Sequence, residues 1–249
     1  MEKAVTVESV TKKFYDFRRG EITVLDNISF FCSPGEIVGI LGPNGAGKTT
    51  MLRLISAILT PTSGTIEVMG LSTVRDPQKI RTHIGFISND TNLYERLTSE
   101  EMVSYFGKLF DLSDETIKAR SQKLYESLGM THILKRLCKN LSAGEKQKVS
   151  IARTLIHDPP ILILDEPTTS LDVLTSRDIL WLVRQARNEG KAILYSAHNM
   201  EEVENLCDRI ILIHQGKKLE EGTIPEVVKR HGAGSLTECF LSLVKDGTS

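Results

Sequence analysis

Apolar residues near the start of the chain occur in short β-branched runs, separated by charged or glycine-containing segments. This pattern predicts antiparallel strands, which we expect over 4–10, 22–25 and 27–32. Compact apolar runs predict the further strands 36–41, 65–70 and 83–88, with a helix over 48–59.

The second half of the chain alternates apolar strands with helical patterns, which is typical of parallel βαβ units. The predicted strands cover 161–164, 191–196 and 208–213, and a hairpin end covers QGKKLEEG. The clearest helix is 173–189, because Ile179, Leu182, Val183 and Ala186 recur at helical spacing. We expect helical segments over 99–129, broken near 111–114, and short helices over NMEEVENL, 225–231 and 236–245. The predicted fold class is α/β.

Composition narrows the class of protein only slightly. The 249 residues are 40% hydrophobic and 25% charged, and the formal net charge is -1. This charge balance indicates neither nucleic acid nor an anionic membrane surface as the partner. The four cysteines form no CxxC pair, which favours a reducing compartment. No apolar run reaches the ~20 residues of a membrane span, so we expect another polypeptide to do any membrane crossing.

A glycine-rich loop between a predicted strand and helix carries the strongest motif. It reads GPNGAGKTT and comprises Gly42, Pro43, Asn44, Gly45, Ala46, Gly47, Lys48, Thr49 and Thr50. The spacing matches G-x-x-x-x-G-K-[ST], whose backbone N–H groups surround nucleotide phosphates. Lys48 supplies a charge to the β- and γ-phosphates, and Thr49 supplies a hydroxyl to Mg²⁺. The alternative is a chance match in a glycine-rich turn.

Acidic and imidazole groups follow two other predicted strands. Asp165 and Glu166 end the run ILILDEP, and His198 follows KAILYS. Ligands of parallel sheets lie at the carboxyl ends of strands, so these groups are expected beside the phosphate loop. We expect Asp165 to hold Mg²⁺ and Glu166 to act as the general base. We expect His198 to hydrogen-bond the γ-phosphate or to hold the attacking water. Strand alternation predicts that Glu166 points away from Asp165. The alternatives are a solvated acidic loop and a structural histidine.

The segment LSAGEKQKVSIAR predicts a second helix start that suits anions. Ser142 and Glu145 have the S-x-x-E spacing of a capping box, in which they satisfy their own helix. A helix start also attracts phosphate. Both interpretations remain open from the residues alone.

These motifs together resemble the ATPase subunit of ATP-binding cassette (ABC) transporters, over residues 3–235. Their order is the family's: P-loop 42–50, signature 141–145, ILILDEP, D-loop 169–172 and switch histidine His198. The resemblance implies a P-loop NTPase (RecA-like) core, an N-terminal antiparallel β-subdomain and an α-helical signature subdomain at about 90–155. A short C-terminal helix and tail, 236–249, follow.

The resemblance also implies how ATP is held. Two cassettes, expected to be identical, pack head to tail, and each ATP lies between one P-loop and the other signature. The signature residues are Ser142, Ala143, Gly144 and Glu145, and the D-loop residues are Ser170, Leu171 and Asp172. Phe14 takes the place of the aromatic that stacks on adenine, with Tyr15 and Phe17 as rivals.

The sequence departs from the family pattern in the signature and in the Q-loop, the segment after strand 83–88 through which coupling to the membrane partner passes in this family. Ala143 and Glu145 replace the common glycine and glutamine, and Asn89 stands where a glutamine usually contacts Mg²⁺ or water, with Asp90 as the alternative. The stretch ISNDTNLYERLTSEE and the short C-terminus resemble exporters of the sodium- and drug-efflux type. The implied partner is a transmembrane permease, with this chain at the cytoplasmic face of the membrane and no nucleic acid involved. The alternative is a soluble cassette that drives assembly or remodelling.

Overall fold

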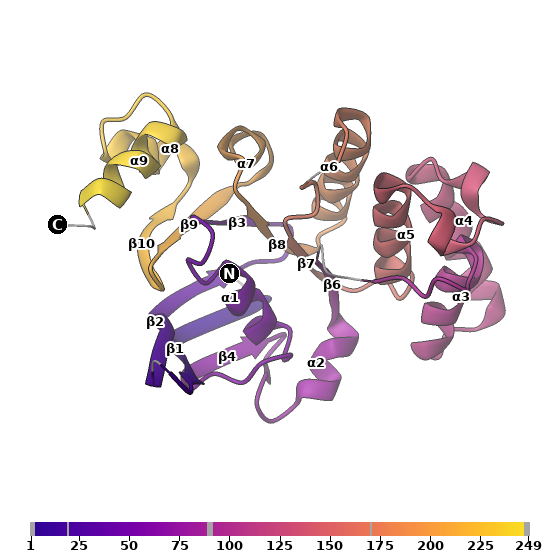
Figure 1. Ribbon diagram of the computed structural model, residues 1–249, viewed down its shortest axis with the longest axis horizontal. Coiled ribbons are helices and arrows are strands. Elements are labelled where there is room, and N and C mark those ends of the chain that lie inside the picture. Colours follow the sequence, from indigo (N-terminus) through magenta and orange to yellow (C-terminus); the bar gives the residue numbers. More distant parts are fainter. Residues whose placement is uncertain (1–2, 19, 89–91, 170, 247–249) are drawn as a thin grey trace.

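A computed structural model describes residues 3–18, 20–88, 92–169 and 171–246. Two sheets form its centre (Figure 1). The antiparallel sheet has the order β2-β1-β4-β5, with β1 Val5–Asp16, β2 Gly20–Cys32, β4 Ser63–Val68 and β5 Leu71–Ser72. The larger sheet has the order β10-β9-β3-β8-β7-β6. Its strands are β3 Ile37–Leu41, β6 Ile84–Ser88, β7 Ile161–Asp165, β8 Ala192–Ala197, β9 Arg209–His214 and β10 Lys217–Gly222.

The larger sheet is parallel except for its edge strand. β3 pairs with β8 and β9 in parallel, β7 pairs in parallel with β6 and β8, and β10 pairs antiparallel with β9. The carboxyl ends of the five parallel strands therefore meet at one edge, where α/β proteins bind ligands. The α/β class predicted from the sequence is confirmed.

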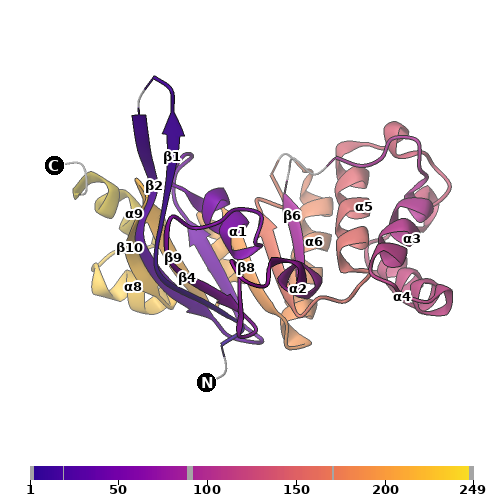
Figure 2. The same ribbon diagram turned by 90° about the horizontal axis from the view of Figure 1, so that it is seen from below.

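Helices occupy both faces and both ends of the sheet (Figures 1 and 2). They are α1 Lys48–Ile55, α2 Pro77–His83, α3 Ser99–Leu109, α4 Asp114–Ser127, α5 Ala143–Leu155, α6 Val173–Asn188, α7 Met200–Leu206, α8 Ile224–Arg230 and α9 Leu236–Asp246. Single 3-10 turns cover Thr131–Ile133 and Cys138–Asn140. The helices α3, α4 and α5 form a block at one end of the molecule, and α8 and α9 lie at the other. None of the helices in these ranges has the length and apolar character needed to cross a bilayer.

Alternation along the buried strands divides the core into two clusters. Ile37 and Leu41 of β3 face the cluster beneath α3–α9, whereas Val38 and Ile40 face the cluster shared with α1 and the antiparallel sheet. Successive strand residues point to opposite faces, so a short, wholly apolar strand can serve both clusters.

Several predicted boundaries were wrong. The runs 22–25 and 27–32 belong to one strand, β2, which pairs with β1 through register shifts. The first strand extends to Asp16, well past the predicted end, and the predicted helix 48–59 stops at Ile55. Helix α2 was missed. The break between α3 and α4 falls where the polar DLSD segment predicted it.

Candidate functional site

The phosphate loop connects β3 with α1, as the motif requires. Gly47 precedes the helix with φ +107°, and no side chain caps the first turn of α1. A Cβ at Gly47 would lie 2.6 Å from Leu25 Cδ2, so the loop packs tightly against β2. Uncapped N–H groups at a helix start give α1 the donors and the dipole that bind phosphate.

Lys48 is held beneath this loop. Its side chain is only 6% exposed, and its ammonium group donates hydrogen bonds to the carbonyls of Gly42 at 2.8 Å and Pro43 at 3.3 Å. The Nζ atom also lies 3.7 Å from Glu166 Oε1. The loop's own carbonyls thus fix the cation at the carboxyl end of the sheet.

Asp165 ends β7 with its carboxylate buried. Ser196 Oγ, on the neighbouring strand β8, donates a hydrogen bond to Asp165 Oδ1 at 2.5 Å. The Glu166 N–H donates to Ser196 Oγ and to the Ser196 carbonyl, both at 3.1 Å. Sequence analysis missed Ser196, although a polar residue at the end of an apolar strand was the available signal. Ser196 fixes the two strand ends relative to each other.

Glu166 lies just beyond β7 in the left-handed conformation, with φ +52°. Its direction is therefore set by this turn, and the argument from strand alternation was wrong. The turn brings Glu166 Oε2 to 3.6 Å from His198 Nδ1 and 3.4 Å from Thr169 Oγ1. Glu166 lies between the ammonium group of Lys48 and the imidazole of His198, which is 58% exposed. A groove of about 680 Å³ borders both Glu166 and His198.

The oxygen donors at this edge suit a small hard cation that keeps other ligands. In the described ranges, no three His, Cys, Asp or Glu side chains gather into a metal-binding group. Mg²⁺ is typically held by one or two protein oxygens together with phosphates and water. Asp165 and Thr49, at the carboxyl end of β7 and the start of α1, fit that requirement.

The signature segment forms the capping box that its spacing predicted. Ser142 Oγ accepts a hydrogen bond from the Glu145 N–H at 3.3 Å, and Glu145 Oε2 accepts one from the Ser142 N–H at 2.8 Å. Arg136 adds a hydrogen bond to Glu145 Oε1 at 2.6 Å. Burial raises the pKa of Glu145, but the bonds from Ser142 and Arg136 outweigh it and lower the pKa. Arg136 was not identified from the sequence.

Asp172 caps α6 next to the signature. Its Oδ1 accepts hydrogen bonds from the N–H groups of Leu174 and Thr175, both at 3.0 Å. The bonds from Thr175 lower the pKa of Asp172. A Cβ at Gly144 would lie 3.1 Å from Thr175 Oγ1, so the signature helix starts against the first turn of α6. Leu171 packs against the core, and Ser170 lies outside the described residues.

Phe14 lies on β1, opposite Ile22 of β2. Its ring is 39% exposed, and Lys12 Nζ lies 4.9 Å from the ring centroid. Tyr15 and Phe17 are more exposed, at 75% and 98%, and contact each other edge to face. Asn89 and Asp90 lie outside the described residues.

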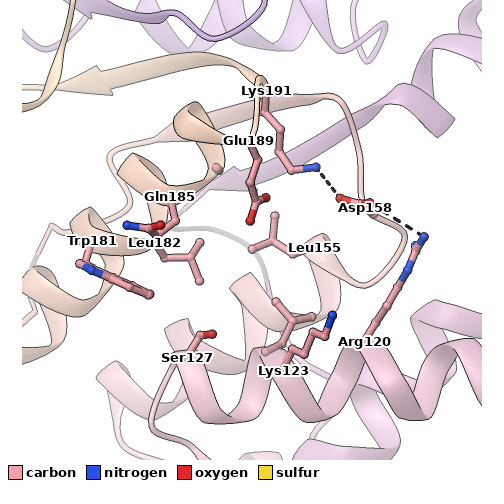
Figure 3. A pocket seen from close by; sticks show the side chains of 12 residues that line it. Arg120, Lys123, Ser127, Leu155, Asp158, Trp181, Leu182, Gln185, Glu189 and Lys191 are labelled. Carbon is pink, nitrogen blue, oxygen red and sulfur yellow. Dashed lines mark hydrogen bonds and ion pairs between the residues drawn. The ribbon is translucent and has the colours of Figure 1, made fainter.

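A second hollow, of about 500 Å³, lies between α4 and α6 (Figure 3). Asp158 and Lys191, which precede β7 and β8, form an ion pair at its edge, and Arg120 lies 3.9 Å from Asp158. The hollow is therefore at the amino ends of these strands. The phosphate loop, Glu166 and His198 are at the carboxyl ends, so this hollow is not part of their site.

The fold and this strand-end site define a P-loop ATPase. The family model described as "ABC transporter" matches residues 25–169. The chain is 40% identical to the ABC transporter ATP-binding protein NatA of Bacillus subtilis, over 98% of this chain and 100% of that protein. It is 35% identical to the linearmycin resistance ATP-binding protein LnrL of the same organism, over 91% of this chain and 73% of that protein. The chain belongs to the ABC transporter family, as an ATP-binding subunit.

Solved structures agree with this membership. An ATP-binding subunit of an ABC transporter matches 97% of this chain and 99% of its own, with a TM-score of 0.88 and 28% identity. A dimeric ATP-binding cassette in a post-hydrolysis state, bound to ADP and Pi, matches 88% of this chain and 98% of its own. Its TM-score is 0.80, with 30% identity. ATP hydrolysis is accordingly the activity of this family of subunits.

Proposed function

We propose that this chain binds ATP with Mg²⁺ along residues 42–50 and hydrolyses it with Glu166 as general base. Lys48 offsets charge on the β- and γ-phosphates, and Phe14 stacks on the base. Thr49 and Asp165 would hold Mg²⁺, which neutralises phosphate charge when bound. Glu166 takes a proton from the attacking water, and His198 orients the water or the γ-phosphate. The approach of Lys48 and His198 to the two Glu166 oxygens, at 3.7 and 3.6 Å, carries this proposal.

The signature of a second cassette completes each site in this proposal. The P-loop follows β3, whereas Thr154 of α5 packs at Gly85 of the edge strand β6. The order β3-β8-β7-β6 separates these strands by three steps, or about 14 Å. Both views support the separation of α1 from α5 (Figures 1 and 2). A solved relative is a dimeric cassette, which supports the same arrangement.

Ser142 and Gly144 then supply donors to the γ-phosphate held by the other chain. The capping box does not prevent this contact. A hydroxyl can accept the Glu145 N–H bond and still donate its own proton to a phosphate oxygen. Leu171 and Asp172 belong to the D-loop, and Asp172 lies beside the signature.

The chain powers export through a transmembrane partner at the cytoplasmic face of the membrane, with Asn89 or Asp90 in the Q-loop role. Relatives named for linearmycin resistance and for Nod factor export support this direction. One relative of the same family is named for methionine import, whereas several are named for export, and this difference in number favours export. Isolation of the native chain together with a multi-span membrane protein would distinguish transport from soluble remodelling.

The substitution Glu166→Gln tests the catalytic assignment. The amide cannot accept the proton of water, so turnover should fall at least about 100-fold while ATP still binds. The variant should accumulate as a dimer in the presence of ATP and Mg²⁺, as measured by light scattering. Hydrolysis at the parental rate would show that Glu166 is not the base.

A further inference from the structure

Tyr195 places a hydroxyl group inside an otherwise apolar part of β8. Its side chain is fully buried in the cluster beneath the helices. The hydroxyl donates a hydrogen bond to Glu202 of α7. Burial, together with the charge of Glu202, raises the pKa of Tyr195, so the hydroxyl keeps its proton and remains a donor.

Glu202 accepts a second hydrogen bond from a hydroxyl group, that of Thr168 in the loop that follows β7. Thr168 Oγ1 lies 3.0 Å from both carboxylate oxygens of Glu202 and 3.5 Å from the Tyr195 hydroxyl. Thr168 comes two residues after Glu166, and Glu202 comes four residues after His198. The three side chains therefore join the loop that carries Glu166 to the helix that follows His198.

This network complements the contacts of Ser196 on the opposite face of the sheet. Tyr195 and Ser196 are neighbours on β8, so their side chains point to opposite faces. Ser196 binds Asp165 and the Glu166 N–H, whereas Tyr195 reaches Thr168 through Glu202. The ends of β7 and β8 are thus fixed to each other from both faces.

His198 has a largely exposed side chain. Its position relative to Glu166 is set by the backbone on either side, by β8 before it and α7 after it. Asn199 is the N-cap of α7, and its Oδ1 accepts a hydrogen bond from the Glu202 N–H at 3.2 Å, so the carboxylate network and the start of the helix share Glu202.

We propose that Glu202, bridging Thr168 and Tyr195, is a positioning residue that sets the separation between Glu166 and His198. The inference rests on the catalytic roles proposed for those two residues. Removing the bridge changes none of the residues assigned to the phosphates but lets the helix start move relative to the loop. Small displacements of groups around a reacting atom cost rate rather than binding.

Paired substitutions at Thr168 separate the hydroxyl group from side-chain volume. Thr168→Val keeps the shape but loses the donor, and should lower kcat by about tenfold with KM changed by less than about twofold. Thr168→Ser keeps the donor and should restore kcat. Tyr195→Phe should resemble Thr168→Val, and the double variant should lose less than the product of the two effects, because both hydroxyls act through one carboxylate.

Thr154→Val is the matched control. Thr154 likewise donates a hydroxyl hydrogen bond, to the Ser150 carbonyl at 2.8 Å, but lies in the last turn of α5. Its kcat should equal that of the parent. Steady-state kinetics, single-turnover hydrolysis and melting temperature are measured for all variants, with Glu166→Gln alongside.

The outcomes are distinct. Thr168→Val and Tyr195→Phe variants that melt earlier yet keep the parental kcat would overturn the positioning role and leave a structural one. Failure of Thr168→Ser to restore kcat would also overturn the positioning role. Parental turnover by Glu166→Gln would instead overturn the proposed function, and with it the role given to Glu202.

Discussion

His157 lies two residues after the end of α5, against Phe110 at the end of α3. Its ring stacks on Phe110 with centroids 3.7 Å apart and an interplanar angle of 4°. Burial disfavours the imidazolium form and lowers the pKa of His157 to about 4. The folded protein therefore favours the neutral imidazole in this stack.

This residue predicts a pH dependence of stability. The unfolded state takes up the proton near pH 6.5 and the folded state only near pH 4, so the unfolded state binds more protons in between. The free energy of unfolding should fall as pH drops from 6.5 to 4, by at most about 3.4 kcal/mol from this group, and change no further from it below pH 4. His157→Phe keeps the stack and should remove this slope in denaturant titrations.

His83→Phe, at the end of α2, is the control for that experiment. It introduces the same side chain away from the α3–α5 contact and should keep the parental slope between pH 6.5 and 4. An unchanged slope in His157→Phe would mean that other groups cause the pH dependence.

At the scale of single residues, the sequence predicted which side chains meet at the strand ends. It did not predict the directions that individual side chains take. The convergence of Lys48, Glu166 and His198 follows from parallel strands that end at one edge. The left-handed turn at Glu166 has no signature in its residue type. Tyr195 looked like another apolar strand residue, because the pattern does not show that its hydroxyl meets Glu202 across the fold.

At the level of elements, the same limits appear as boundary errors. Strand β2 continues through the polar pair Asp26–Asn27 because β1 supplies backbone partners on both sides of it. Helix α2 was missed because Ile80 is its one fully buried apolar residue, which is too little for a periodic pattern. In contrast, the capping box and the DLSD break were predicted correctly, because local hydrogen bonding determines both.

Comparison of the capping boxes at α3 and α5 allows the two roles of Ser142 to be separated. Thr98 at α3 has the same reciprocal bonds as Ser142 at α5, with carboxylate-to-N–H distances of 2.8 Å in each. Ser142→Ala and Thr98→Ala should each lower the free energy of unfolding by about 1 kcal/mol. Only Ser142→Ala should also lower the ATPase rate, because in the proposed dimer Ser142, unlike Thr98, donates to the phosphate. An equal loss of ATPase activity in both variants would mean that Ser142 acts only as a helix cap.

At the scale of the whole molecule, the phosphate loop and the signature lie on different parts of one chain. The sheet order places β8 and β7 between the strand before the loop and the strand under α5. An uncapped helix start with Lys48 and a capped one with Ser142 therefore serve the same phosphate only if two chains combine. Each dimer then contains two composite sites, and every site takes one half from each chain.

Composite sites predict that two inactive variants restore each other. Lys48→Ala removes the positive charge that offsets the phosphates. Ser142→Arg blocks the signature but should leave nucleotide binding by its own chain intact. Each variant alone should form two defective sites and show no turnover. In an equal mixture, half of the dimers are mixed, and each mixed dimer has one site with an intact loop and an intact signature. The mixture should therefore recover about a quarter of the parental ATPase rate, if one intact site works at its normal speed. The two variants are incubated together with ATP and Mg²⁺ before the rate is measured. The mixture, each variant alone and the parent are compared at the same total protein concentration. No recovery at any mixing ratio, with both variants folded, would mean that one chain supplies the whole site.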